Sequence, residues 1–245
     1  MKTYRIPDLL PYIDWTYFYY AWGVKEGQRE AAEIRTEAER LLHHLSLNGV
    51  VARAASKDMP AWAEGDDIVT PEGRLSFLRQ QHAHADRPSL CMADYIAPAG
   101  YEDASHVADH IVLFATTVIA SHECPCCVGD PLLLQTAKDR LAEAAAERLH
   151  REEYGGRGIR PAVGYPSMPD QSLIIDIASH LPFQKMGIRL TENCMMLPHA
   201  STCGLILFHP AATYFAVGRV ADDQLADYAR RRQLSTTYLR KYLPQ

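Results

Sequence analysis

The sequence lacks the motifs of several common nucleotide and hydrolase sites. It contains no Gly-x-Gly-x-x-Gly dinucleotide motif, no phosphate-binding P-loop, no Gly-x-Ser-x-Gly nucleophile motif and no His-Glu-x-x-His zinc motif. Each motif is a fixed spacing of glycines, hydroxyls or ligating side chains that its chemistry requires. A Rossmann site, a serine hydrolase triad and a zinc protease are therefore unsupported.

A strong charge bias and a long apolar run are also missing. The 245 residues carry a formal net charge of −5, with 47% hydrophobic and 22% charged residues, as in soluble globular proteins. No basic stretch dominates, so nucleic acid is not favoured as a partner. The N-terminus has no apolar signal region, and no apolar run reaches membrane-spanning length. We therefore expect a cytoplasmic protein with no membrane partner.

The cysteines do not follow a known metal spacing. Six are present, and Cys124, Cys126 and Cys127 gather directly after His122 and Glu123. Cysteines of a cytoplasmic chain are expected to be reduced thiols. The spacing Cys-x-Cys-Cys differs from Cys-x-x-Cys, and no second pair follows. We predict no metal site, with a metal or redox role for this cluster as the less favoured alternative.

Hydrophobic periodicity predicts an α+β fold, because strands cluster apart from helices. Helices are predicted over residues 26–47, 104–121, 131–154, 170–181, 222–231 and 235–243. Strands are predicted over residues 49–52, 67–69, 188–196, 204–208 and 214–220, the last three as an antiparallel meander. We expect one curved domain over residues 1–245, with a mainly antiparallel sheet, surrounding helices and an aromatic helical segment, residues 1–48, packed on it.

Capping residues mark several helix ends. Asp130 is the expected N-cap of a helix that has Pro131 in its first position and ends near Gly155. Asp170 is expected to open the next helix, and Ser235 to cap the last one. The run 230–232, three arginines, is interpreted as a solvated helix end.

The segment from Gly158 to Asp170 cannot be an ordinary helix or central strand. It holds two glycines and three prolines, which respectively permit unusual backbone angles and fix φ. It predicts a shaped loop that presents Arg160 and Tyr165, and such loops often carry function. The alternative is a plain connection between two elements.

Several side chains are candidates for ligand contact, each with a structural alternative. Asp14 lies among aromatic residues, where it could hold an ammonium or sulfonium group, or it could be an exposed N-cap. Arg160 could bind a carboxylate with two parallel hydrogen bonds, or it could be a surface arginine. Glu143 lies opposite the apolar stripe of its helix and reads as solvent-exposed, with no reason to choose it over Glu147.

A strand is predicted to carry Tyr214 and Phe215. Neighbouring residues of a strand face opposite sides. One ring would then lie in the core while the other faces a ligand.

Eight short segments carry a family resemblance that covers nearly the whole chain. They are residues 12–16 (Tyr-Ile-Asp-Trp-Thr), 92–98, 139–144, 160–169, 190–193, 208–210, 214–217 and 227–231. In content and order they resemble the activation domain of cobalamin-dependent methionine synthase. The resemblance implies a curved α+β domain that binds S-adenosylmethionine and docks over the corrin ring of a cobalamin-binding domain. It also implies that a flavodoxin-like donor reduces inactive cob(II)alamin and that S-adenosylmethionine then methylates it.

The resemblance assigns three residues to the amino acid portion of S-adenosylmethionine. Asp14 and Glu143 would contact it, with Asp14 at its ammonium group. Arg160 would bind its carboxylate.

Four further residues take roles from the same resemblance. Ala162 would contribute backbone hydrogen bonds, and Tyr214 and Phe215 would line the pocket. Tyr165 would lie between ligand and corrin, where its phenol could orient a water near cobalt; this is the catalytic role implied.

The chain departs from the family pattern at several positions. Gln171 stands where the family usually has histidine, and Met168 replaces a common cysteine. Phe215 stands where the family often has a second tyrosine, and the segment between Leu149 and Arg160 is shorter than usual.

The chain also lacks the Asp-x-His-x-x-Gly motif of the cobalamin domain, and it has no room for folate and homocysteine barrels. It cannot be a complete methionine synthase. We expect a free-standing reactivation domain that acts on a truncated synthase or another corrinoid protein, as part of a methyltransferase system. The alternative is an S-adenosylmethionine sensor without methyl transfer. A small-molecule methyltransferase is less favoured, because no general base can be named near Tyr165.

Overall fold

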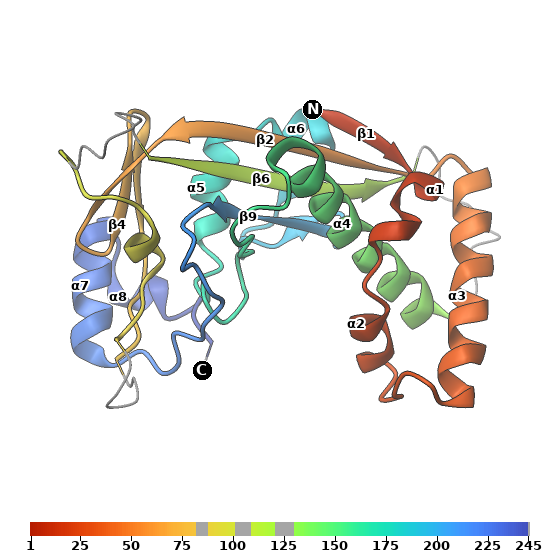
Figure 1. Cartoon of the computed structure of the whole chain (residues 1–245). Helices are drawn as coiled ribbons and strands as arrows, with labels where there is room; N and C mark the ends of the chain where they lie inside the picture. Colours follow the sequence, from red (N-terminus) through yellow and green to blue (C-terminus); the bar gives the residue numbers. More distant parts are fainter. Residues whose placement is uncertain (82–87, 101–108, 121–129, 245) are drawn as a thin grey trace.

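The fold is built on a four-stranded antiparallel sheet. The computed structural model describes residues 1–81, 88–100, 109–120 and 130–244. In pairing order the strands are β1 (Lys2–Arg5), β2 (Val51–Pro60), β6 (His110–Ile119) and β9 (Ser201–Leu207). β2 and β6 pair along their whole length, from Val51 opposite Ile119 to Pro60 opposite His110. Figure 1 shows these strands as a long curved band across the top of the molecule.

Different elements extend below the two ends of this band (Figure 1). One end carries β3 (Trp62–Glu64), β4 (Asp67–Thr70), β5 (Gly73–Ser76), η2 (Met92–Tyr95), α7 (Asp222–Arg232) and α8 (Thr236–Leu239). The other carries α1 (Ile6–Leu9), η1 (Leu10–Tyr12), α2 (Trp15–Tyr20) and α3 (Arg29–Leu47). The remaining elements are α4 (Pro131–Tyr154), α5 (Leu173–His180), α6 (Phe183–Met186), β7 (Arg189–Leu190) and β8 (Met196–Leu197). This arrangement is the α+β fold that the sequence predicts.

β6 corrects the helix predicted over residues 104–121. Residues 101–108 and residue 121 lie outside the described residues, and His110–Ile119 is a strand. Leu113 packs in one core cluster with α5 and α6, whereas Val112 and Phe114 pack in a second cluster with α4. Because both faces of the strand are buried, its apolar run is continuous and hides the alternation that usually identifies a strand.

The capped helices form where the sequence places them. The Asp130 carboxylate accepts hydrogen bonds from the backbone N–H groups of Leu132 and Leu133, at 2.8 and 3.4 Å. α4 ends at Gly155 in the left-handed conformation, with φ +66°. Ser235 caps α8 through the backbone N–H of Tyr238. Local capping chemistry therefore fixes these boundaries.

The C-terminal predictions need three corrections. The segment 214–220 contains no strand, and residues 188–196 hold only β7 and the first residue of β8. α5 begins at Leu173 after Ser172 rather than at Asp170. One oxygen of buried Asp170 still accepts a hydrogen bond from the Ser172 N–H at 2.8 Å, and the other accepts from the Tyr228 hydroxyl at 2.8 Å. The carboxylate therefore joins a local turn before α5 to a tertiary contact with α7.

The arginine run at the end of α7 is solvated at only one of its three positions. The Arg230 side chain is 74% exposed, but those of Arg231 and Arg232 are 11% and 7% exposed. Arg231 pairs with Asp67, and Arg232 pairs with Asp170 and Asp176. The solvated helix end predicted here is therefore wrong for two of the three residues. Sequence spacing could not reveal it because the partner carboxylates lie far away in the chain.

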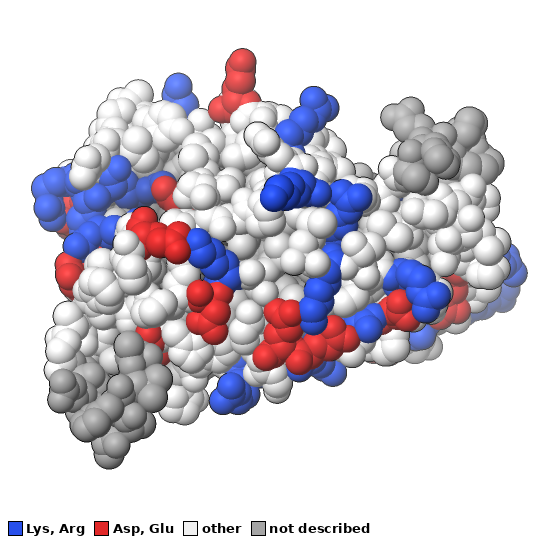
Figure 2. All heavy atoms as spheres, turned by 90° about the horizontal axis from the view of Figure 1, so that it is seen from above, with Lys and Arg blue, Asp and Glu red and all other residues white. Residues whose placement is uncertain are grey.

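The described part of the chain has a mixed surface charge and neither a membrane-spanning helix nor a cluster of metal ligands. Figure 2 shows both signs of charge close together on one face, with uncharged areas between them. Within the described ranges, no helix is long and apolar enough to cross a membrane, and no group of three potential metal ligands occurs. Cys91, Cys194 and Cys203 are free and buried. The cluster Cys124, Cys126 and Cys127 lies outside the described residues.

Candidate ligand pocket

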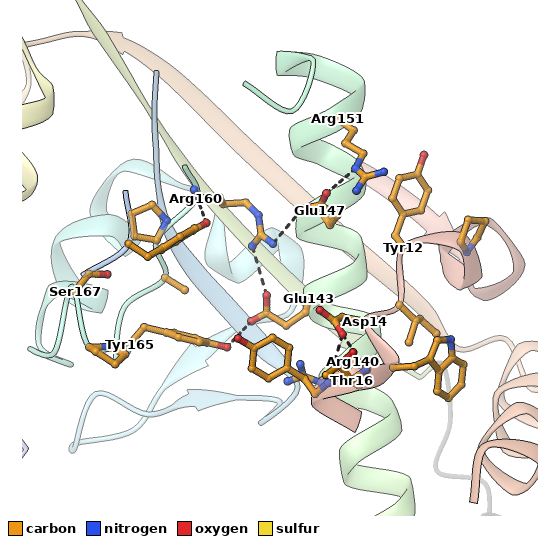
Figure 3. A pocket seen from close by; sticks show the side chains of 18 of the residues that line it. Tyr12, Asp14, Thr16, Arg140, Glu143, Glu147, Arg151, Arg160, Tyr165 and Ser167 are labelled. Carbon is orange, nitrogen blue, oxygen red and sulfur yellow. Dashed lines mark hydrogen bonds and ion pairs between the residues drawn. The ribbon is translucent and has the colours of Figure 1, made fainter. Parts of the chain in front are cut away.

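A cavity of about 1010 Å³ opens beside α4. Four stretches of chain supply most of its wall: residues 11–17, α4 from Arg140 to Arg151, the loop 160–167, and residues 214–216. Figure 3 shows side chains from these stretches around it. All seven residues predicted as ligand contacts line the cavity: Asp14, Glu143, Arg160, Ala162, Tyr165, Tyr214 and Phe215. The tertiary fold thus brings together residues separated by up to 201 positions in the chain.

Backbone pairing with β9 holds the loop after α4 in place. Ile159 and Leu207 exchange backbone hydrogen bonds of 2.9 and 3.0 Å, and the Leu205 N–H donates to the Pro161 carbonyl at 3.0 Å. A Cβ on Gly158 would lie 1.9 Å from the Leu207 carbonyl oxygen, and one on Gly204 would lie 2.1 Å from that of Pro161. Only glycine allows the two backbones to approach so closely. The loop therefore has a fixed backbone conformation that presents side chains, as predicted.

A tight turn then places Tyr165 at the rim of the cavity. The Gly164 N–H donates to the Met168 carbonyl at 2.8 Å, and the Met168 N–H donates to the Tyr165 carbonyl at 2.9 Å. The Tyr165 residue is 46% exposed. Its hydroxyl donates to Glu143 Oε1 at 3.3 Å. Partial burial, and then the Glu143 charge, raise the pKa of Tyr165 above its usual 10.0, so the phenol stays protonated at neutral pH.

Arg160 is a largely buried cation in the pocket wall rather than a surface arginine. Its side chain is 13% exposed, and its guanidinium lies 5.3 Å from the ring centroid of Phe114. Nη1 lies 3.4 Å from Glu143 Oε2, and Nη2 lies 3.6 Å from Glu147 Oε2. Among the described residues, buried Nε has no hydrogen-bond partner. The guanidinium therefore has donor capacity left for a ligand.

The structure corrects the solvent-exposed prediction for Glu143. Its side chain is 24% exposed, because the loop carrying Arg160 and Tyr165 covers that face of α4. Helical spacing cannot predict that a loop from elsewhere in the chain covers this face of the helix. Sequence reasoning does not distinguish Glu143 from Glu147, and in the structure both line the cavity.

Asp14 is the exposed N-cap that one of its alternatives describes, whereas contact with an ammonium or sulfonium group stays a prediction. It is the N-cap of α2, since Oδ1 accepts from the N–H groups of Thr16 at 2.9 Å and Tyr17 at 3.4 Å. It also lines the cavity. Capping fixes the position of the carboxylate, and both capping bonds go to the same oxygen, Oδ1.

No strand carries Tyr214 and Phe215, and their rings differ in burial although both residues line the cavity. Tyr214 is 64% exposed, and its hydroxyl accepts a 2.9 Å hydrogen bond from the Arg160 N–H. Phe215 is half-buried and packs 6.4 Å from the ring of Tyr95. Tyr214 therefore faces the loop, while Phe215 packs on the core.

Sequence reasoning missed several charged and aromatic wall residues. They include Tyr12, Arg140 and Arg151, while Glu147 enters the sequence argument only as an alternative to Glu143. One signal was available, since 143, 147 and 151 recur every four residues and must share one face of α4.

Two departures from the family pattern lie outside the cavity wall. Met168 is buried in the core beneath the loop, and exposed Gln171 donates its N–H to the Tyr242 carbonyl at 3.1 Å. Of the substituted positions, Phe215 is the one that lines the cavity.

The fold and the cavity define an α+β domain with a pocket that carries both signs of charge. The chain belongs to the family of the vitamin B12-dependent methionine synthase activation domain, whose model matches residues 5–233. A similar solved structure is the crystal structure of the MetH reactivation domain bound to AdoHcy (S-adenosylhomocysteine). The two chains share 30% sequence identity with a TM-score of 0.84, over 98% of this chain and 87% of that chain.

Proposed function

We propose that the cavity binds S-adenosylmethionine and that the chain uses it to methylate reduced cobalamin held by a separate corrinoid protein. The observation that carries the proposal is the convergence of all seven predicted contacts on one cavity. The relative with a similar fold was solved with AdoHcy bound, and AdoHcy is what remains after a methyl group leaves S-adenosylmethionine.

The charges of the wall suit this ligand. Arg160, with its unpartnered Nε, is the proposed partner of the ligand carboxylate. Asp14 and Glu143 supply negative charge for the ammonium group, and acidic lining residues outnumber basic ones by four to three: Asp14, Glu26, Glu143 and Glu147 against Arg140, Arg151 and Arg160. A pocket with this balance favours a ligand that carries one carboxylate and two positive charges.

The chain's residues act mainly by positioning. S-adenosylmethionine supplies an electrophilic methyl group, whose bond to sulfur breaks as it joins the reduced cobalt, leaving AdoHcy. Arg160, Asp14 and Glu143 fix the amino acid portion and thereby the direction of the methyl group. Tyr165, at the exposed rim, is the residue that we place toward the corrin. The reducing electron comes from a flavodoxin-like donor.

Calorimetry with AdoHcy tests the binding step. Arg160→Ala should weaken AdoHcy binding roughly tenfold or more, because a charge-assisted hydrogen bond is worth about 1.5–3 kcal/mol. Arg29→Ala is the control, since the Arg29 side chain is 87% exposed on α3 and is absent from the cavity wall. Equal affinity for wild type and Arg160→Ala would remove Arg160 from the site.

A spectroscopic assay tests the methylation step. The chain is mixed with a cobalamin-loaded synthase fragment that lacks its activation domain, together with S-adenosylmethionine and a flavodoxin reducing system. The absorption spectrum of methylcobalamin should appear only when the chain is present. Ligand binding without methylcobalamin would favour the sensor alternative.

A further inference from the structure

Two carboxylates share Arg160 in the pocket wall. Glu143 and Glu147 are one helical turn apart on α4, where like charges repel. The Arg160 guanidinium lies between them, with Nη1 at 3.4 Å from one and Nη2 at 3.6 Å from the other (Figure 3). Both distances exceed the usual 2.7–2.9 Å of a charge-assisted hydrogen bond. Arg160 is therefore neutralised but loosely held.

Glu147 has a second and closer partner. Arg151 Nε lies 2.6 Å from Glu147 Oε1, in the favourable order with the acid four residues before the base. The ring of Tyr12 lies 5.7 Å from the Arg151 guanidinium. Glu147 thus bridges two arginines, and only its longer contact involves Arg160.

Glu143 forms no second ion pair in the described part of the chain. Its other oxygen accepts the Tyr165 hydroxyl at 3.3 Å, which is a neutral donor. If Arg160 turned to a ligand carboxylate, Glu143 would need the ligand's ammonium group as a new counter-charge. Glu147 would remain paired with Arg151.

We propose that Glu147 is an internal competitor for Arg160 and sets the affinity of the pocket for ligands that carry a carboxylate. The incoming carboxylate takes the guanidinium from Glu147, and Arg151 retains Glu147, so Glu147 is not left without a counter-charge. Glu147 is a specificity-determining residue because a ligand without a carboxylate cannot make this exchange. The inference rests on the proposed function and deepens it.

Calorimetry with two probes tests the exchange. AdoHcy has the carboxylate, whereas 5′-methylthioadenosine lacks the whole amino acid group. Glu147→Gln should tighten AdoHcy binding roughly two- to fivefold, the range of a partly exposed ion pair, and leave methylthioadenosine binding unchanged. The gain should persist at 0.5 M salt, because screening removes long-range charge effects but not a direct contact.

A second variant tests the role of Arg151. Arg151→Ala frees Glu147 to pair with Arg160 alone, so AdoHcy binding should weaken, and adding Glu147→Gln should restore it. Glu33→Gln is the matched control, since Glu33 also forms an i,i+4 pair with an arginine but on exposed α3. Its AdoHcy affinity should equal that of wild type.

The outcomes separate the two proposals. If wild type binds AdoHcy but Glu147→Gln binds it equally or more weakly, the exchange is overturned and the proposed function stands. If methylthioadenosine binding rises as much as AdoHcy binding, the effect is not carboxylate exchange and the inference also fails. If wild type binds no AdoHcy, the proposed function fails, and the exchange fails with it.

Discussion

Single residues decide how the site loop meets the sheet. Gly158 combines φ +76° with a backbone carbonyl where a Cβ would stand, whereas Gly164 in the same loop has φ +90° and open space. An alanine at Gly158 would meet both backbone strain and a steric clash, whereas an alanine at Gly164 would meet backbone strain alone. Composition predicts that the loop is shaped, but it cannot say which glycine lies against another strand.

Gly158→Ala should lower the free energy of unfolding by about 3 kcal/mol, since left-handed strain of about 1–2 kcal/mol adds to a backbone clash. Gly164→Ala should lower it by only about 1–2 kcal/mol, because strain acts there alone. Urea unfolding of both variants measures the difference. Equal losses would mean that the pairing of Ile159 with Leu207 is not as close as the structure has it.

At the scale of elements, α7 is tied to the end of the site loop by buried charges. Arg232 contacts Asp170, which ends the loop segment, and Asp176, which lies in α5. The Tyr228 hydroxyl binds the same Asp170 carboxylate. α7 thereby fixes the far end of the segment that carries Arg160 and Tyr165.

Arg232→Leu should destabilise the fold by about 3–5 kcal/mol, because it leaves the Asp170 carboxylate buried with its cation removed. Arg230 lies two residues earlier in α7, and its side chain is 74% exposed. Arg230→Leu should therefore change the free energy of unfolding by less than about 0.5 kcal/mol. Thermal and urea unfolding measure both. A small loss for Arg232→Leu would show that the network contributes little to holding α7.

At the scale of the whole molecule, one buried histidine links stability to pH. His150, near the end of α4, is 5% exposed, and its Nε2 lies 2.7 Å from the Arg157 carbonyl oxygen. Burial lowers the pKa of His150 below its usual 6.5, although the carbonyl partly opposes the shift. Between the lowered pKa and 6.5, the unfolded chain binds more protons than the folded one.

The free energy of unfolding should therefore fall as pH drops from 7.5 through 6.5 and should level off for this group below its folded pKa. His150→Gln should flatten that part of the curve, while His43→Gln on the exposed face of α3 should retain it. Urea unfolding between pH 7.5 and 5.5 measures the three slopes. This range lies above the titration of Glu152 and Asp227, whose pKa values are lowered by Arg148 and Arg231 respectively. Identical slopes for wild type and His150→Gln would exclude His150 as the source.

The sequence by itself determined the features that depend on neighbours along the chain. It placed α4 between Asp130 and Gly155, capped α8 at Ser235, and marked the loop that presents Arg160 and Tyr165, because caps and turns act within a few residues. The motif order also identified the family, which the comparisons confirm. All seven predicted contacts line one cavity, while their role toward a ligand stays a prediction.

Only the tertiary structure decided what depends on partners far away in the chain. It buried both faces of β6, turned Arg231 and Arg232 inward toward Asp67 and Asp170, and brought the exposed face of α4 under the loop. It also made Glu147 a partner of Arg160. Helical spacing could not distinguish Glu147 from Glu143. Burial and ion pairing are set by packing between distant segments, and local periodicity carries no information about which segments those are.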